Sequence, residues 1–272
     1  IKELDLLNKE VFGPIVHLIR FKADELDNVV SQINQCGYGL TLGIHSRLTS
    51  VADYLANNIN VGNVYINRNM VGAVVGVQPF GGRALSGTGP KAGGKHYLEA
   101  LVKPHNQIFN MRLTLASQTN ELLNISVINQ AKTAWSSWHK QDLESRVMVL
   151  TQLCSEIAET LGETLAKDCV NALELMHLKI SQPNQLAGPT GELNQVYYES
   201  RGVVVVVGDK QQTLNAHLSC IIAALLAGNV VICAMAETDK TVMEQIENSI
   251  RKSGLPRKTL QFLNDRYMTQ LI

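Results

Sequence analysis

The stretch from Gly62 to Gly89 reads GNVYINRNMVGAVVGVQPFGGRALSGTG, and the first half of the chain is organised around it. It begins with a short apolar run, residues 62–67, that is typical of a β-strand. A loop follows in which glycines alternate with Val, Pro and Phe; we call residues 67–82 the glycine loop. Glycine at this density indicates positive φ angles or close backbone approaches, and the apolar residues indicate a packed loop. A packed glycine loop directs unpaired backbone N–H groups to one side, an arrangement that holds carboxylates or phosphates.

The composition is that of an ordinary folded protein. The chain has 272 residues, of which 45% are hydrophobic and 18% charged, enough for one large or two modest domains. Lys plus Arg and Asp plus Glu are balanced at 24 each, so no basic field for nucleic acid is predicted. The five cysteines form no Cys-x-x-Cys pair and no metal-ligand spacing, which is typical of reduced cytosolic thiols. No apolar run reaches the length of a membrane span. The first residue is Ile1, and a strand-like pattern begins at once, which indicates a piece of a longer polypeptide.

Strand and helix patterns alternate around the glycine loop. The predicted elements are, in order, a strand after Pro14, a helix over residues 24–35, a strand over 40–45, a helix over 48–59, the strand over 62–67, a short helix over 91–101 and an extended segment over 102–110. This order predicts an α/β fold with a partly parallel sheet.

The second half begins after a polar segment, residues 111–120, that is interpreted as a linker. The predicted elements are a helix over residues 121–139, two helices between 143 and 180 broken near Gly162, a strand over 203–207, a helix over 214–227, a strand over 230–233 and a helix over 237–253. Trp135 and Trp138 share a helical face and are interpreted as a packing anchor. The strand–helix–strand–helix order predicts a Rossmann-type unit.

The glycine loop resembles the end of the catalytic domain of the aldehyde dehydrogenases. The shared features are the Pro-Phe-Gly-Gly run at residues 79–82 and the Ser86-Gly87 pair, which is expected to close the loop. Residues 67–69, 72–76 and 78–82 are similar, more narrowly, to the aldehyde dehydrogenase module of the bifunctional proline utilization A family. The resemblance implies an aldehyde-dehydrogenase-like α/β fold: part of a catalytic domain over residues 1–110, the linker, and a degenerate Rossmann-type domain over 121–272.

The resemblance implies a substrate site and part of a cofactor site. Gly72 and Ala73 would donate backbone N–H groups to the α-carboxylate of L-glutamate γ-semialdehyde, and Phe80 would pack against its methylene chain. Holding the acid group fixes the position of the aldehyde carbon. Glu10 would hold the nicotinamide ribose hydroxyls of NAD, since a carboxylate accepts two hydrogen bonds, and Phe12 would pack by the ring. Taken alone, Glu10 is also explained as a solvated residue, and Phe80 as a core aromatic.

The implied reaction needs a Cys nucleophile and a Glu that activates water, and the family's motifs for both are missing from this sequence. We therefore expect no catalytic residue here: the parent is an NAD-dependent dehydrogenase, and the isolated chain is inactive. FAD is expected only in a separate proline dehydrogenase domain of the parent. The expected partners are the substrate, the upstream domains and further copies in a homo-oligomer. The expected location is cytoplasmic, with peripheral attachment of the parent at the inner membrane left open.

The second half resembles a degraded aldehyde dehydrogenase cofactor domain. Residues 201–204 and 223–229 match its beginning. Residues 209–211, Asp-Lys-Gln, stand where the family has Pro-Trp-Asn, and Ala234-Met235 where it has Lys-Pro. Without that Lys, a charge-assisted contact to the adenosine ribose is lost. The fold is therefore expected to persist while the site has decayed.

A second motif of the long proline utilization A proteins, Gly-Pro-Thr-Gly-Glu-x-Asn, occurs here as residues 188–194. In that family the C-terminal domain is non-catalytic and supports the active-site domain. Glu192 could be interpreted as a catalytic carboxylate, but no partner acid, base or nucleophile accompanies it. We predict a tight structural turn set by Pro189 and Gly191.

Two functions of different classes stay open. The chain either contributes part of a semialdehyde dehydrogenase site, or it is a non-catalytic module for oligomerisation or for capping a partner. Cys and Glu motifs upstream in the parent gene would separate these alternatives. A generic aldehyde dehydrogenase of other specificity is disfavoured, because a plain aldehyde has no carboxylate for Gly72 and Ala73 to hold.

Overall fold

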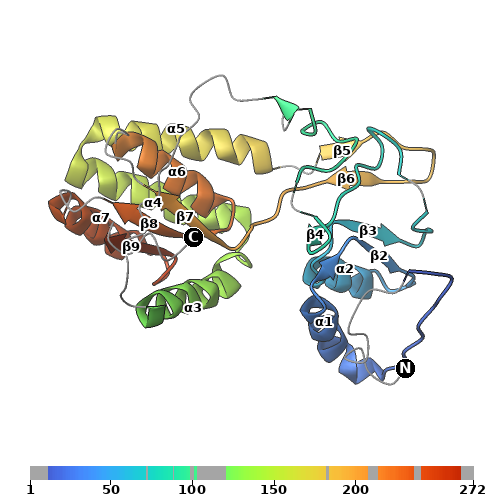
Figure 1. The fold of residues 1–272 in the computed structure, drawn as a ribbon. Coiled ribbons are helices and arrows are strands. Elements are labelled where there is room, and N and C mark those ends of the chain that lie inside the picture. The colour runs from blue at the N-terminus through green and yellow to red at the C-terminus, as the bar shows by residue number, and fades with distance from the viewer. Residues whose placement is uncertain are drawn as a thin grey trace. The chain divides into compact units, whose positions relative to one another are not determined.

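The computed structural model describes residues 12–71, 73–87, 89–98, 101–102, 121–181, 184–207, 214–235 and 240–264 (Figure 1). The chain forms two compact units, residues 1–108 with 185–194, and residues 109–184 with 195–272. Residues 185–194 therefore belong to the first unit, although they lie far along the chain and their motif was assigned to the second half. The predicted linker, residues 111–120, lies outside the described residues.

The first unit is built on a small parallel sheet. Strand β2 (Thr41–Ile44) pairs in parallel with β3 (Asn63–Ile66), which confirms the predicted strand at the start of the opening stretch. Its other elements are the 3-10 turn η2 (Ala23–Glu25), helices α1 (Leu26–Gln35) and α2 (Thr49–Asn58), and the antiparallel pair β1 (Tyr38–Gly39) and β4 (Arg83–Ala84). Val30, Ile59 and Val61 form the buried centre of this unit.

Two predicted elements of the first unit are wrong. Within the described part of residues 12–22 there is no strand, and Val16 and Leu18 are largely exposed. Among the described residues, no strand pairs with this alternating segment. Residues 91–98 form turns instead of a helix, because Gly93 takes a φ of 71° and Ala92 pairs with Phe80 in an antiparallel bridge. The segment 103–110, predicted to be extended, lies outside the described residues.

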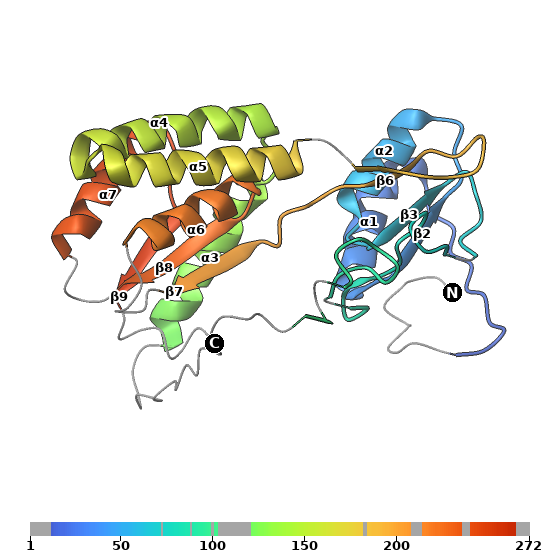
Figure 2. The ribbon, with the colours of Figure 1, turned by 90° about the horizontal axis from the view of Figure 1, so that it is seen from above.

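The second unit contains a three-stranded parallel sheet of order β7-β8-β9. The strands are β7 (Val203–Val207), β8 (Val230–Met235) and β9 (Leu260–Asn264). Helix α3 lies against one face and α6 against the other, with α4 and α5 outside α6 (Figure 2). The predicted βαβα order is confirmed. A further two-stranded sheet pairs β5 (Asn184–Leu186) with β6 (Asn194–Val196); neither this sheet nor β9 was predicted.

The helices of the second unit follow the sequence pattern closely. They are α3 (Glu121–Trp138), α4 (Leu143–Leu161), α5 (Glu163–Ile180), α6 (Leu214–Leu226) and α7 (Lys240–Ser253). The predicted break at Gly162 is confirmed: its φ of 101° favours glycine and separates α4 from α5. Asp142 caps α4 by accepting a hydrogen bond from the Ser145 backbone N–H at 2.7 Å.

The two tryptophans anchor α3, as predicted. The Trp138 side chain is fully buried, and its Nε1 donates to the Leu225 carbonyl at 3.0 Å. Trp135 Nε1 donates to the Ser200 hydroxyl at 3.0 Å, and its ring stacks on His139. A buried indole whose N–H is bonded contributes both apolar area and fixed geometry.

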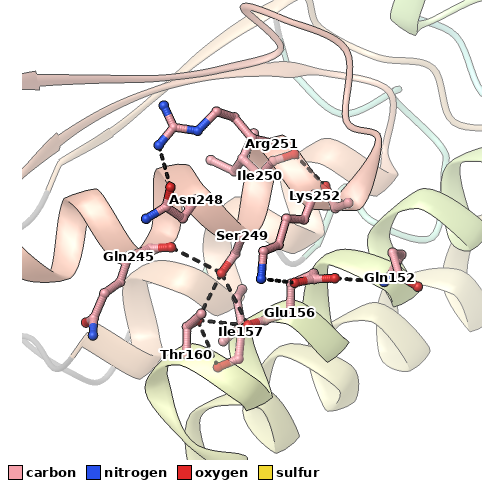
Figure 3. Close-up of polar contacts among 11 residues, drawn as sticks. Gln152, Glu156, Ile157, Thr160, Gln245, Asn248, Ser249, Ile250, Arg251 and Lys252 are labelled. Atoms are coloured by element: carbon pink, nitrogen blue, oxygen red, sulfur yellow. Dashed lines mark hydrogen bonds and ion pairs between the residues drawn. The ribbon is translucent and has the colours of Figure 1, made fainter.

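A polar network joins α4 to α7 (Figure 3). The Thr160 and Ser249 hydroxyl oxygens lie 2.9 Å apart, and Ser249 also donates to the Glu156 carbonyl. The Glu156 carboxylate lies 3.5 Å from Lys252 Nζ and accepts a hydrogen bond from Gln152. Glu156 Oε2 has this ion pair but no hydrogen-bond partner among the described residues, and the remaining contacts of the network account for the packing of α4 against α7.

Candidate functional site

The predicted site residues are only partly described. Glu10 and Gly72 lie outside the described residues. Phe12 is 90% exposed, so its ring is not packed in the core of the first unit. Ala73 is exposed and Phe80 half-buried. The structure thus places Ala73 and Phe80 in the glycine loop and Phe12 on an exposed segment.

The backbone amides of the glycine loop fall into two groups. Gly76 N donates to the Gly93 carbonyl at 2.9 Å, and Gln78 N donates to the Val74 carbonyl at 2.8 Å. In the described part of the chain, the Ala73 N–H has no hydrogen-bond partner. Hydrogen bonds thus order part of the loop, and the Ala73 amide is one of several loop amides that, among the described residues, are available to an anion.

Lys91 fastens this loop to the start of β3. Its Nζ donates to the carbonyl oxygens of Gly62 and, at 3.0 Å, of Gly81, and to Oδ1 of Asn63 at 3.0 Å. Asn63, which is 9% exposed, in turn donates through Nδ2 to the carbonyls of Leu40 and Gly81 at 2.9 and 3.1 Å. One ammonium and one amide thus satisfy the oxygens of a crowded turn. Sequence reasoning missed both residues, since a lone Lys or Asn beside glycines carries no distinctive signal.

Close backbone approaches require glycine at Gly62, just before the glycine loop, and at Gly82, at its end. A Cβ on Gly62 would lie 1.9 Å from the Gly81 carbonyl oxygen, and a Cβ on Gly82 would lie 2.5 Å from that of Ser86. The Ser86 hydroxyl accepts a hydrogen bond from the Gly39 backbone N–H at 3.0 Å. The expected closure of the loop by Ser86 is confirmed, and side chains are excluded from its centre.

A carboxylate from residues 185–194 completes the surroundings of the loop. Glu192 Oε1 lies 2.8 Å from Arg68 Nη1, and Oε2 accepts a hydrogen bond from Gln78 Nε2 at 3.3 Å. The prediction that Glu192 sits in a tight turn is confirmed by its N–H bond to the Pro189 carbonyl at 3.1 Å and by Gly191 at φ 92°. The charged partner Arg68 was not foreseen.

The chemistry that this arrangement offers is binding. Cys36, the cysteine of the first unit, is exposed at the end of α1, where its Sγ donates to the Gln32 carbonyl. Among the described residues there is no cluster of His, Cys, Asp or Glu that could hold a metal ion. No helix in the described part is long and apolar enough to cross a membrane.

In the second unit, residues that match the cofactor-domain pattern have structural roles. The Asn229 Oδ1 accepts hydrogen bonds from the backbone N–H groups of Arg201 and Gly202 at 2.6 and 3.1 Å, and its Nδ2 donates to the Ala224 carbonyl. Asn229 therefore ties the end of α6 to the start of β7. Residues 209–211 lie outside the described residues. A hollow of about 730 Å³ lies elsewhere in this unit, lined by Ser126, Asn129, Gln130, Thr133, Ala134, Ser137, Arg257 and Lys258.

Comparison with known proteins links both halves of the chain to one protein family. The family model described as "Aldehyde dehydrogenase family" matches residues 2–107 and 108–270. The bifunctional protein PutA of Klebsiella aerogenes is 39% identical over 220 residues, which is 80% of this chain and 15% of that protein. The 1-pyrroline-5-carboxylate dehydrogenase 1 of Halalkalibacterium halodurans is 41% identical over 96 residues, 35% of this chain and 18% of that protein.

A solved structure agrees at the level of fold. A crystal structure of a variant of proline utilization A from Bradyrhizobium japonicum has a TM-score of 0.50 at 19% identity, and the match covers 57% of this chain and 18% of that chain. The chain thus spans less than a fifth of the length of each relative named here. Since the family model matches nearly the whole sequence, the chain belongs to the aldehyde dehydrogenase family.

Proposed function

We propose that this chain is part of an NAD-dependent dehydrogenase that oxidises L-glutamate γ-semialdehyde to L-glutamate in proline catabolism. Its glycine loop holds the substrate's α-carboxylate through the backbone N–H groups of Gly72 and Ala73, and Phe80 lines the path of the methylene chain. The names of the relatives, PutA and 1-pyrroline-5-carboxylate dehydrogenase, support this substrate. The observation that carries the proposal is the Ala73 amide, which has no hydrogen-bond partner among the described residues and lies between the bonded amides of Val71 and Gly76.

The nucleophile and most of the NAD site belong to the rest of the parent protein. From this chain only Glu10 and Phe12 are assigned to NAD, at the nicotinamide ribose and ring, and the exposure of Phe12 fits that role. When bound, NAD accepts the hydride from the aldehyde carbon. The residues described here orient the substrate for that step, because fixing its acid group fixes the distance from the loop to the aldehyde. The upstream domains, further copies of the parent and a cytoplasmic location are part of the same proposal.

The test uses the full-length polypeptide that includes the upstream half. Ala73→Pro removes one N–H donor, and a hydrogen bond to a charged group contributes about 1.5–3 kcal/mol. We expect KM for L-glutamate γ-semialdehyde to rise about 10-fold to 100-fold, while KM for propanal, which has no carboxylate, stays the same. Equal effects on both aldehydes, or no effect on either, would exclude the anchor. NADH formation by the 272 residues alone would contradict the assignment of the nucleophile to the rest of the parent.

A second function, a non-catalytic structural module, is favoured for the second unit. The side-chain oxygen and nitrogen of Asn229 are both bonded to backbone groups that join α6 to β7. In addition, Ala234-Met235 replace the Lys-Pro pair of the family pattern. We expect NAD to leave the fluorescence of Trp135 and Trp138 unchanged when it is titrated into the chain. Saturable quenching by NAD would show that the cofactor site of this unit persists.

A further inference from the structure

One carboxylate contacts the glycine loop on both sides of Ala73. Arg68 precedes residues 72–73 and Gln78 follows them, and Glu192 binds each through a different oxygen, Arg68 through Oε1 and Gln78 through Oε2. The segment between the two contacts is the one that holds the substrate's acid group in the proposed function. Glu192 thus closes the base of that segment from outside the loop.

The turn that presents Glu192 holds the carboxylate in place. Its backbone is fixed by the hydrogen bond from Glu192 N to the Pro189 carbonyl and by the positive φ of Gly191. The Asn194 Nδ2 lies 3.4 Å from Glu192 Oε2 and 3.5 Å from the Ala187 carbonyl oxygen, within the same turn. The Gly-Pro-Thr-Gly-Glu-x-Asn motif therefore supplies a carboxylate, the turn that orients it and an amide beside it.

The loop side of the contact is equally restrained. The Arg68 guanidinium lies over the Tyr65 ring, 5.5 Å from its centroid, and Tyr65 is buried in β3. Gln78 is held by its backbone bond to Val74. The Arg68 and Glu192 side chains are each 27% exposed, so the ion pair is partly shielded from water. A carboxylate between two such fixed groups restrains the distance between them.

We propose that Glu192 is a positioning residue of the glycine loop. By joining Arg68 to Gln78 it fixes the loop conformation in which the Ala73 amide faces the substrate. It also neutralises Arg68, which would otherwise offer the substrate's carboxylate a competing cation next to the correct amides. The identity of the ligand rests on the proposed function, whereas the restraint of the loop does not.

The first test measures the restraint in the 272-residue chain itself. In Glu192→Gln the shape is kept and the charge is lost. We expect hydrogen exchange at the bonded amides of Gly76 and Gln78 to accelerate about twofold to fivefold, the range for a partly exposed ion pair. Glu174→Gln is the matched control, since Glu174 is exposed on α5 and has no polar contact among the described residues. Unchanged exchange in Glu192→Gln would overturn the proposal.

A charge-reversal experiment distinguishes loss of the Arg68–Glu192 ion pair from general misfolding. Arg68→Glu and Glu192→Arg are each expected to accelerate exchange, and the double variant is expected to restore much of the protection because the pair is re-formed with opposite polarity. Circular dichroism and tryptophan fluorescence show whether each variant is folded. Additive effects of the two reversals would contradict a direct pair.

The second test separates positioning from a purely structural role. In the full-length polypeptide we expect Glu192→Gln to raise KM for L-glutamate γ-semialdehyde about twofold to fivefold, with kcat and KM for propanal nearly unchanged. If Ala73→Pro raises this KM and Glu192→Gln does not, the inference fails and the proposed function stands. If Glu192→Gln accelerates exchange but Ala73→Pro leaves KM unchanged, the restraint stands and the proposed function fails.

Discussion

Lys91 Nζ lies 3.0 Å from Asn63 Oδ1, and both side chains also donate to the carbonyl oxygen of Gly81. This shared acceptor makes the start of β3 and the glycine loop one structural piece. We predict that Lys91→Met lowers the stability of the first unit by about 2 kcal/mol, because it removes charge-assisted hydrogen bonds. It should also accelerate hydrogen exchange at Gly76.

The tryptophans allow the two units to be followed separately. Both tryptophans, Trp135 and Trp138, belong to the second unit. In Lys91→Met the urea transition followed by tryptophan fluorescence is therefore expected to be unchanged, while exchange in the first unit increases. Lys179→Met, at an exposed position of α5, is the control. A shift of the fluorescence transition alone would contradict the assignment of Lys91 to the first unit.

Asn229 is predicted to be the most sensitive polar residue at the junction of α6 and β7. Asn229→Ala removes the acceptor of two backbone N–H groups in a residue that is 8% exposed. Gly202 is buried, and a buried donor left unsatisfied costs about 1–3 kcal/mol, so we expect a loss of about 1–3 kcal/mol in urea unfolding. Asn248→Ala, on the exposed side of α7, should change stability by less than about 0.5 kcal/mol. Equal effects at the two positions would contradict the structural role of Asn229.

We expect the reactivity of the cysteine thiols to follow their exposure to solvent. Cys36 and Cys220 are exposed, whereas Cys154, Cys169 and Cys233 are buried. Burial raises the pKa of the Cys233 thiol to about 12, so thiolate is scarce near neutral pH. We predict fast reaction of two thiols with a disulfide reagent at pH 8 and of all five after denaturation. Serine replacements of Cys36 and Cys220 should abolish the fast phase; a surviving fast phase would show that a buried thiol is accessible.

The Asp142 cap predicts a pH dependence of stability. The backbone N–H and the hydroxyl of Ser145 donate to its carboxylate and hold its pKa below the ordinary value. A lowered pKa in the folded state gives a contribution that is complete above the unfolded pKa of about 3.9 and is lost as the pH falls through the folded pKa. The difference in melting temperature between the wild type and Asp142→Asn should therefore shrink below about pH 4. If the difference in melting temperature instead increases on acidification, the lowered pKa assigned to Asp142 in the folded state is wrong.

Sequence patterns correctly predicted the helices and strands whose conformation is set by residues close together in the sequence. The five consecutive valines of β7 suit a strand, and Gly162 marks the break between α4 and α5 because its backbone conformation favours glycine. The alternation after Pro14 led to a wrong strand, since alternation shows that a segment suits a sheet without supplying a neighbour. Likewise, Gly93 redirects the chain where a short helix was predicted.

The surroundings of the glycine loop depend on contacts that no local pattern contains. Gln78 and Glu192 are 114 positions apart, and the prediction of a tight turn for residues 188–194 said nothing about where that turn lies. The family resemblance assigned roles to Gly72, Ala73 and Phe80, but it did not indicate Lys91, whose importance appears only when three oxygens converge on one ammonium.

Residues 185–194 belong to the first unit. Cutting the gene between the two halves of the chain would therefore not yield the two units. A gene divided between codons 111 and 120 would leave Arg68 on one product and its counter-charge on the other. Shuffling, duplication or loss of either half would therefore disturb both, and the two halves are expected to have evolved as one.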